Sequence, residues 1–173
     1  MRHKIDKVRL LLPSPEMVNR AMEFRAEYLK AGEIKINGSR ALHDFGNFRE
    51  WLKAVKNTEA TDEIPSSTFF LVRVSDGFII GICNIRHQTD ERQIPEGHVG
   101  YSVRPTMRKK GYGTELLRLA LIKAESLGVI EAVVSCKKTN AASKRVIEKN
   151  GLRFEREFVY EDGETVLMYK KAF

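Results

Sequence analysis

The chain has 173 residues, of which 42% are hydrophobic and 31% charged, a composition typical of a single soluble domain spanning residues 1–173. No run approaches the ~18 apolar residues of a membrane span, and the first residues lack the apolar core of a signal peptide, so we expect a cytoplasmic protein without a membrane partner. The net charge of +7 admits a nucleic-acid partner, but no zinc-finger spacing or RNP-type aromatic motif accompanies it. We therefore expect no nucleic-acid partner and a hydrated basic surface.

The first predicted elements are one strand and two helices. The strand covers residues 7–12 and is closed by the prolines that follow it, and the helices cover residues 16–31 and 45–56. The apolar residues at helical spacing are Met17, Ala21, Phe24, Tyr28 and Leu29 in the first helix and Phe45, Phe48, Trp51, Leu52 and Val55 in the second. The apolar residues of the first helix lie near one face, and a stripe like that of the second helix is usually core, so we expect the second stripe to be buried.

Two further strands are predicted over residues 68–74 and 78–86. Asp76-Gly77 between them is a strong hairpin signal, and their apolar content predicts central positions in a sheet. A turn-rich loop follows over residues 88–97. The two cysteines of the chain, Cys83 and Cys136, each lie in a strand-like run, so we expect buried, reduced thiols. No cluster of metal-ligand residues is visible, and we expect no metal cofactor.

The stretch that carries most information is residues 103–114. Before it, residues 98–103 alternate like a strand, with Val99, Tyr101 and Val103 on one side. After it, apolar residues recur at three- and four-residue intervals up to Gly128, which predicts a helix. The first N–H groups of a helix have no internal partner and carry partial positive charge, so this basic, glycine-containing turn predicts a phosphate site.

Five basic residues surround this turn in the sequence, and Glu115 is the only acid among them. They are Arg104, Arg108, Lys109, Lys110 and Arg118. The spacing excludes a Walker loop, and Gly111-Tyr112-Gly113 lacks the third glycine of a dinucleotide fingerprint. Residues 108–113 (Arg-Lys-Lys-Gly-Tyr-Gly) instead resemble the pyrophosphate-binding motif of the GNAT superfamily of acetyl-CoA-dependent N-acetyltransferases.

A second match lies downstream. Residues 131–136 read as a buried strand, and a helix is predicted from Asn140 to Asn150, with Gly151 as its stop. This region resembles the superfamily's second cofactor segment, in which Asn140, Ser143, Lys149, Gly151 and Leu152 fill the motif positions. The last predicted element is a hairpin over residues 153–160 and 165–169, and the resemblance covers roughly residues 68–170.

The resemblance implies an α/β (α+β) fold, a GNAT-like mixed and mostly antiparallel sheet of six to seven strands flanked by about four helices, with the fourth and fifth strands splayed apart. The cofactor-binding core would span about residues 97–152. The implied acetyl-CoA contacts are Ser102, Val103, Arg108, Lys109, Lys110, Gly111, Tyr112, Gly113, Thr114, Asn140 and Ser143, with carbonyls near Ser135 contributing from the other side of the splay.

The implied activity is direct attack of a primary amine on the thioester of acetyl-CoA. This chemistry needs a base or water route for the ammonium proton, a donor for the developing oxyanion near Val103, and a proton for the departing thiolate. Candidates for the base are Glu96 and His98, near where relatives place a catalytic carboxylate, although the closest position is Gly97 itself. The tyrosine that usually protonates the thiolate is replaced by Ile147, which makes Ser143 the candidate acid; Tyr160, Tyr169 and water are further candidates.

The expected acceptor is a small-molecule or peptide amine that the sequence does not identify. A homodimer is possible, since no residue decides the oligomeric state. The helix over residues 45–56 forms one wall of the acceptor groove in the superfamily, so Phe45, Phe48 or Trp51 could touch substrate, although core positions are the stronger expectation. Acidic residues in the loop over residues 88–97 suggest a site for a cationic amine; they are Asp90, Glu91 and Glu96. An alternative to the enzyme is a non-catalytic acyl-CoA-binding module on the same fold.

Overall fold

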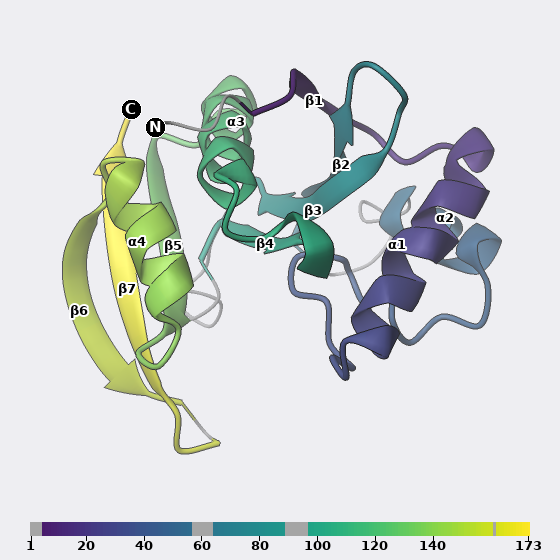
Figure 1. The fold of residues 1–173 in the computed structure, drawn as a ribbon. Helices are drawn as coiled ribbons and strands as arrows, with labels where there is room; N and C mark the ends of the chain where they lie inside the picture. Colours follow the sequence, from purple (N-terminus) through teal and green to yellow (C-terminus); the bar gives the residue numbers. More distant parts are fainter. Residues whose placement is uncertain (1–4, 57–63, 89–96, 161) are drawn as a thin grey trace.

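The computed structural model describes residues 5–56, 64–88, 97–160 and 162–173, in which seven strands and four α-helices are found (Figure 1). The strands are β1 (Val8–Leu11), β2 (Ser66–Arg73), β3 (Ile79–Arg86), β4 (Val99–Val103), β5 (Glu131–Lys137), β6 (Arg153–Val159) and β7 (Thr165–Ala172). The helices are α1 (Val18–Lys30), α2 (Phe48–Lys56), α3 (Tyr112–Ser126) and α4 (Ala141–Lys149), and short 3-10 turns lie at Pro15–Met17 and Pro105–Met107. Within these described ranges, no helix is both long and apolar enough to cross a membrane.

The strands form two antiparallel sheets, one in the order β1-β2-β3-β4 and one in the order β5-β7-β6. The hairpin at Asp76-Gly77 joins β2 and β3, which are central in the first sheet as predicted. Hydrogen-bonded pairing stops between β4 and β5, so the expected splay of the fourth and fifth strands is confirmed. The mixed α/β architecture with four flanking helices is likewise confirmed.

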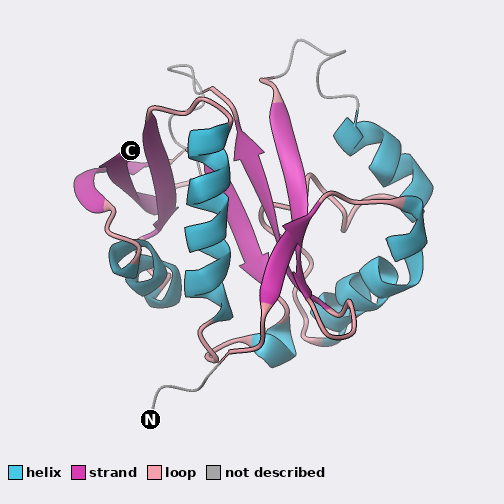
Figure 2. Ribbon diagram, turned by 90° about the horizontal axis from the view of Figure 1, so that it is seen from above, coloured by secondary structure: helices cyan, strands magenta, loops and turns pink. Residues whose placement is uncertain are grey.

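Helices cover both faces of the first sheet, because its central strands are apolar on both sides (Figure 2). Phe70 and Val72 of β2 pack in one core with α1 and α2, whereas Phe69 and Leu71 pack in the other core with α3. Both cysteines are buried free thiols, as predicted. Helix α4 lies over one face of the second sheet (Figure 1), where Ile147 is fully buried.

Three details of the N-terminal half differ from the predictions. Helix α1 begins at Val18, after a 3-10 turn, and α2 begins at Phe48 instead of Phe45. Leu29, which the spacing placed near the apolar face of α1, is 53% exposed. Its neighbour Tyr28 already completes the buried face of α1, and the next position lies about 100° further round the helix. Phe48 and Trp51 are core residues, which confirms the stronger expectation for both.

Candidate functional site

The central feature of the site is the gap between β4 and β5, which is closed at one end by His98. The His98 N–H donates to the Val133 carbonyl at 2.7 Å, and the Val133 N–H donates to His98 Nδ1 at 3.0 Å. Gly97 lies against the same segment with φ of 65°, and a Cβ atom there would be 2.5 Å from the Val133 oxygen. Position 97 therefore has no room for a carboxylate side chain. Beyond this closed end, β4 and β5 are not paired.

The edge of β4 that borders the gap exposes backbone groups of alternate residues. Arg104 N–H donates to the Ile80 carbonyl and Arg86 N–H donates to the His98 carbonyl, so the even-numbered residues of β4 bond to β3. By the alternation of an antiparallel ladder, the N–H groups of Tyr101 and Val103 point the other way, into the gap. The backbone of Ser102 is committed to β3, which moves the expected backbone donor role to its two neighbours.

The N-terminus of α3 lies at the open end of the gap. Gly111 caps the helix with φ of 95°, a conformation that favours glycine, and the Glu115 N–H bonds to the Gly111 carbonyl at 3.2 Å. The N–H groups of residues 112–114 come before that bond in the helix and therefore have no acceptor within it. A Cβ on Gly113 would lie 3.4 Å from Val146 of α4 and 3.7 Å from Val103, so this glycine faces the space where α3, α4 and β4 meet.

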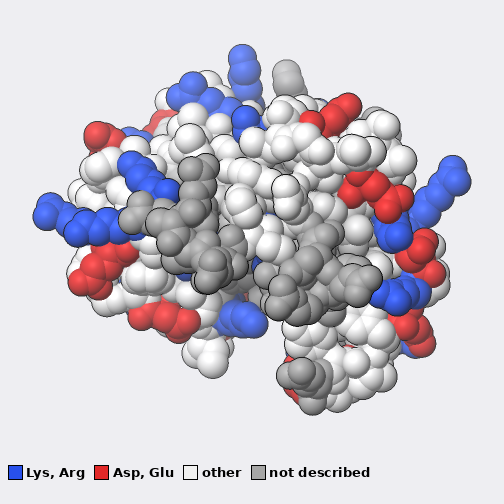
Figure 3. Space-filling model, turned by 180° about the vertical axis from the view of Figure 1, so that it is seen from behind, with Lys and Arg blue, Asp and Glu red and all other residues white. Residues whose placement is uncertain are grey.

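The basic residues around this turn are used differently from the prediction. Arg104 pairs with Glu27, Arg108 pairs with Glu33 at 2.8 Å and donates to the Val103 carbonyl, and Arg118 pairs with Glu115. The two glutamates, one in α1 and one just after it, thus bind the loop that leads into α3. Lys109 and Lys110 are exposed, and the described residues place no carboxylate against either one. Elsewhere, Lys and Arg are interspersed with Asp and Glu on the face seen in Figure 3.

The start of α4 lies on the opposite side of the gap from β4. Asn140 is the N-cap, and its Oδ1 accepts a hydrogen bond from the Ser143 N–H at 3.0 Å. The Ser143 hydroxyl lies 2.9 Å from the hydroxyl of Tyr101. Burial raises the pKa of Tyr101 to about 12, with a smaller opposing effect from Ser143. Tyr101 was not predicted as a functional residue, because strand alternation places it in the apolar face of β4 and says nothing of its hydroxyl.

His98, Tyr169 and Tyr160 are further candidates for the acid or the base among the described residues. Burial, together with the nearby Arg86 charge, lowers the pKa of His98. Its Nδ1 lone pair already accepts from Val133, so neutral His98 carries its proton on Nε2 and is oriented as a donor. Tyr169 is buried in the core, and Tyr160 lies 38% exposed in the β6–β7 connection. Glu96 and the rest of the acidic loop, Asp90 and Glu91, lie outside the described residues.

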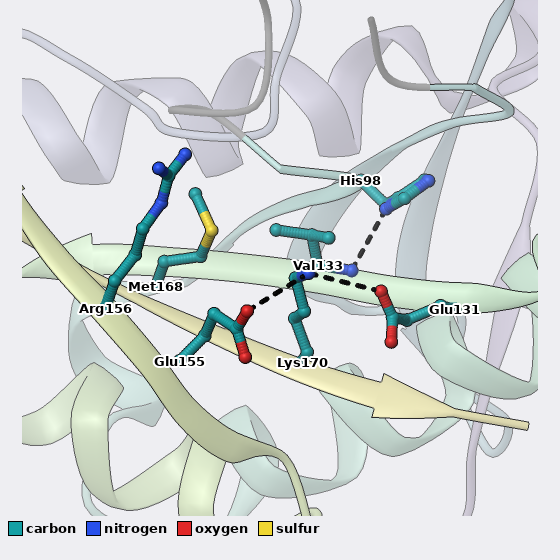
Figure 4. Close-up of a pocket in the computed structure, with 7 residues that line it drawn as sticks. All are labelled: His98, Glu131, Val133, Glu155, Arg156, Met168 and Lys170. Carbon is teal, nitrogen blue, oxygen red and sulfur yellow. Dashed lines mark hydrogen bonds and ion pairs between the residues drawn. The ribbon is translucent and has the colours of Figure 1, made fainter. Parts of the chain in front are cut away.

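A cavity of about 440 Å³ lies beside the closed end of the gap (Figure 4). Its lining residues come from β5, β6 and β7 and from the position just before β4; they are His98, Glu131, Val133, Glu155, Arg156, Met168 and Lys170. Lys170 bridges Glu131 and Glu155, with Nζ to oxygen distances of 3.5 and 3.4 Å. The amine of Lys170 thus already lies between the carboxylates of Glu131 and Glu155 in this cavity.

The arrangement fits coenzyme A at the level of its chemistry. Partner-seeking amides and a side-chain-free Gly113 suit a pyrophosphate, and the N–H groups of Tyr101 and Val103 suit the carbonyls of an extended arm. Among the described residues, no group of three or more His, Cys, Asp or Glu is arranged to hold a metal ion.

Comparison with known proteins gives one family match and several structural matches. A family model for an acetyltransferase (GNAT) domain matches residues 15–153. A ribosomal L7/L12 alpha-N-protein acetyltransferase in complex with coenzyme A has a TM-score of 0.69 at 14% identity, covering 99% of this chain and 96% of its own. A microcin C7 self-immunity acetyltransferase in complex with acetyl-CoA and AMP has a TM-score of 0.69 at 16% identity, covering 98% and 94%.

A chimaeric spermidine N-acetyltransferase built from a Vibrio cholerae protein has a TM-score of 0.68 at 12% identity, covering 95% of this chain and 94% of its own. At these identities the likeness concerns the fold. None of the curated proteins compared with the chain matches it.

Proposed function

Because the chain belongs to the GNAT acetyltransferase family and is therefore an acyltransferase, we propose that it moves the acetyl group of acetyl-CoA to a primary amine. The observation that carries this proposal is the unpaired edge of β4, where the N–H groups of Tyr101 and Val103 face the gap beside the N-terminus of α3. That combination offers hydrogen bonds to an extended acyl carrier and to its phosphates at once.

The residues proposed to hold acetyl-CoA follow from this geometry. The amides of Tyr112, Gly113 and Thr114 bind the pyrophosphate, with Lys109 and Lys110 adding positive charge from the loop. Gly111 allows the left-handed turn into the helix, and Arg108 holds the loop to the segment just after α1 through Glu33. Val103 and its neighbour Ser102 border the arm on the β4 side, and Asn140 and Ser143 border it on the α4 side.

Acetyl-CoA supplies an acetyl group activated as a thioester. The chain contributes hydrogen-bond donors on both sides of the reacting carbonyl carbon: a backbone N–H of Tyr101 or Val103 stabilises negative charge on the acetyl oxygen, and the Ser143 hydroxyl donates toward the sulfur. We assign His98 the role of holding β4 to β5, because its Nδ1 is occupied by the Val133 N–H.

The acceptor proposed for this site is an amine that enters through the cavity of Figure 4. Glu131 and Glu155 would bind the ammonium group of the acceptor in place of the ammonium group of Lys170. The structural relatives act on both acceptor classes, since one is an alpha-N-protein acetyltransferase and another is a spermidine N-acetyltransferase. A small-molecule or peptide amine is therefore the acceptor class to test.

The test is amine-dependent release of CoA thiol from acetyl-CoA, measured with polyamines, amino-acid amides and short peptides. Gly113→Glu introduces a carboxylate beside the proposed phosphate position, and kcat/KM for acetyl-CoA should fall by about a hundredfold or more, because like charges about 4 Å apart repel by about 4 kcal/mol at an effective dielectric constant near 20. Gly46→Glu is the matched control, since a Cβ atom at position 46 would have no other atom within 4 Å and the backbone there does not have a positive φ.

Three outcomes of this experiment are informative. Turnover that is lost in Gly113→Glu and kept in Gly46→Glu supports the proposed function and identifies the acceptor class. Binding of acetyl-CoA without turnover on any amine favours the acyl-CoA-binding module. Equal activity in the two variants contradicts the phosphate site at α3.

A further inference from the structure

Two hydroxyl groups face each other across the gap between the sheets. Tyr101 comes from β4 and Ser143 from the first turn of α4, and their oxygen atoms are 2.9 Å apart. The Ser143 N–H is held by Asn140 at 3.0 Å, so the backbone of this serine is fixed by the cap. The Ser143 hydroxyl proton can still rotate, and its direction depends on which hydrogen bond Oγ accepts.

Either hydroxyl of this pair can donate to the other, and the chemistry of the two groups favours the phenol as the donor. Burial raises the pKa of Tyr101 to about 12, so its proton stays on the oxygen at neutral pH. A phenol O–H is more acidic than an alcohol O–H and is the stronger hydrogen-bond donor. When Tyr101 donates to Ser143 Oγ, the serine proton is directed away from Tyr101 and is free to meet a second acceptor.

We propose that Tyr101 is a positioning residue that orients the Ser143 hydroxyl toward the sulfur of coenzyme A. The inference rests on the proposed function, since it places the CoA arm in the gap. When the carbon–sulfur bond breaks, Ser143 Oγ–H donates a hydrogen bond to the sulfur, which carries the electron pair of that bond as negative charge. The amine proton leaves to solvent, and no net change occurs at Tyr101 or Ser143.

The test measures the thiol pKa of bound CoA from the ultraviolet absorbance of its thiolate, and so it requires no acceptor amine. Complexes with desulfo-CoA provide the baseline, which subtracts the ionisation of the protein's own groups around the gap. These are Cys83, Cys136, Lys144, Glu148, Tyr101 and Tyr169. The variants are Tyr101→Phe, Ser143→Ala and the double variant, with Tyr160→Phe as the matched control.

In the wild type, the bound thiol should have a pKa about one unit below that of free CoA, the size expected for one hydrogen bond to a charged group. Ser143→Ala should remove this shift, and Tyr101→Phe should remove about half of it or more. The double variant should match Ser143→Ala alone, because Tyr101 acts through the serine. Tyr160→Phe should leave the pKa at the wild-type value.

Tyr101→Phe with an unchanged bound thiol pKa overturns the inference, and so does a Tyr101→Phe effect that persists in the Ser143→Ala background. A purely structural role would lower the affinity for CoA and desulfo-CoA equally while leaving the thiol pKa alone. Failure of the wild type to bind CoA overturns the proposed function as well, so the two failures are distinguishable. The melting temperature of each variant, measured without ligand, confirms that it is folded.

Discussion

The ion pair between Arg104 and Glu27 gives a sharp prediction, because it joins α1 to the loop that leads into the proposed phosphate site. The carboxylate of Glu27 pairs with Arg104 Nε through one oxygen and accepts from the Thr106 N–H at 2.7 Å through the other. Arg104 also donates to the Ile79 carbonyl at 3.1 Å, and its guanidinium lies over the Phe78 ring. Replacing Glu27 by Gln keeps the shape of this contact and removes its charge.

The magnitude follows from how far the two side chains are withdrawn from water. The Arg104 side chain is 7% exposed and that of Glu27 is 19% exposed. Removing one partner of a fully buried pair costs about 3–5 kcal/mol, and the partial exposure of Glu27 lowers our expectation for Glu27→Gln to about 2–3 kcal/mol. Glu33→Gln is the matched control, since the Glu33 and Arg108 side chains are 37% and 40% exposed. Its cost should be below about 1 kcal/mol.

The assay is urea denaturation of both variants over a range of pH. Burial alone would raise the pKa of Glu27, but hydrogen bonds from Arg104 and Thr106 outweigh it, so the pKa lies below its ordinary value of 4.5. A carboxyl with a lowered folded-state pKa stabilises the fold above the unfolded-state pKa, and this stability is lost as pH falls through the folded-state pKa. The difference between wild type and Glu27→Gln should therefore shrink below about pH 4.5. Equal destabilisation by Glu27→Gln and Glu33→Gln at neutral pH would refute the reasoning.

Three further predictions concern the gap and the cavity. His98→Ala leaves the buried Val133 N–H without an acceptor and should lower the free energy of unfolding, measured in urea, by about 1–3 kcal/mol. His98→Asn can supply an acceptor and should cost less. Since the pKa of His98 is lowered, the wild type should lose stability below about pH 6.5, and His98→Asn should lose less. Asn140→Ala removes the α4 cap and should cost about 1 kcal/mol, and an unchanged melting temperature would contradict it. Glu155→Gln should raise the amine KM several-fold while that of acetyl-CoA stays constant, and the same rise in Glu157→Gln, whose carboxylate pairs with Lys138 outside the cavity, would argue against an acceptor site there.

The sequence pattern predicted the order and type of the elements because periodicity and turn residues are local signals. The Asp76-Gly77 hairpin and the stop of α3 before Gly128 both lie where their residues predicted them. Helices α1 and α2 begin two and three residues later than predicted, because 3-10 turns and caps at helix ends depend on contacts with other segments. The splay between β4 and β5 came from the family resemblance and has no local signal.

The use of the basic cluster could not be predicted from local sequence. Arg104 and Arg108 lie close to Gly111 in the chain and were expected beside the phosphate, but their carboxylate partners, Glu27 and Glu33, are more than 70 residues away. Folding brings α1 against the loop that leads into α3, and each arginine forms an ion pair with the carboxylate that this contact places beside it. The proposed phosphate site then depends on the amides of α3 and on Lys109 and Lys110, which counting the positive charges around the turn would not have suggested.

The role of Tyr101 depends on where the gap begins, which is also a tertiary property. Strand periodicity placed Tyr101 on the apolar face with Val99 and Val103, which is its side in the structure. Its hydroxyl has a partner only because β4 and β5 are held together at His98 and separate beyond it, so that a tyrosine on one strand reaches a serine on α4. A closed sheet would have paired the Tyr101 N–H with β5 and left no space for a ligand. The imidazole that closes one end of the gap thus also fixes where the gap begins.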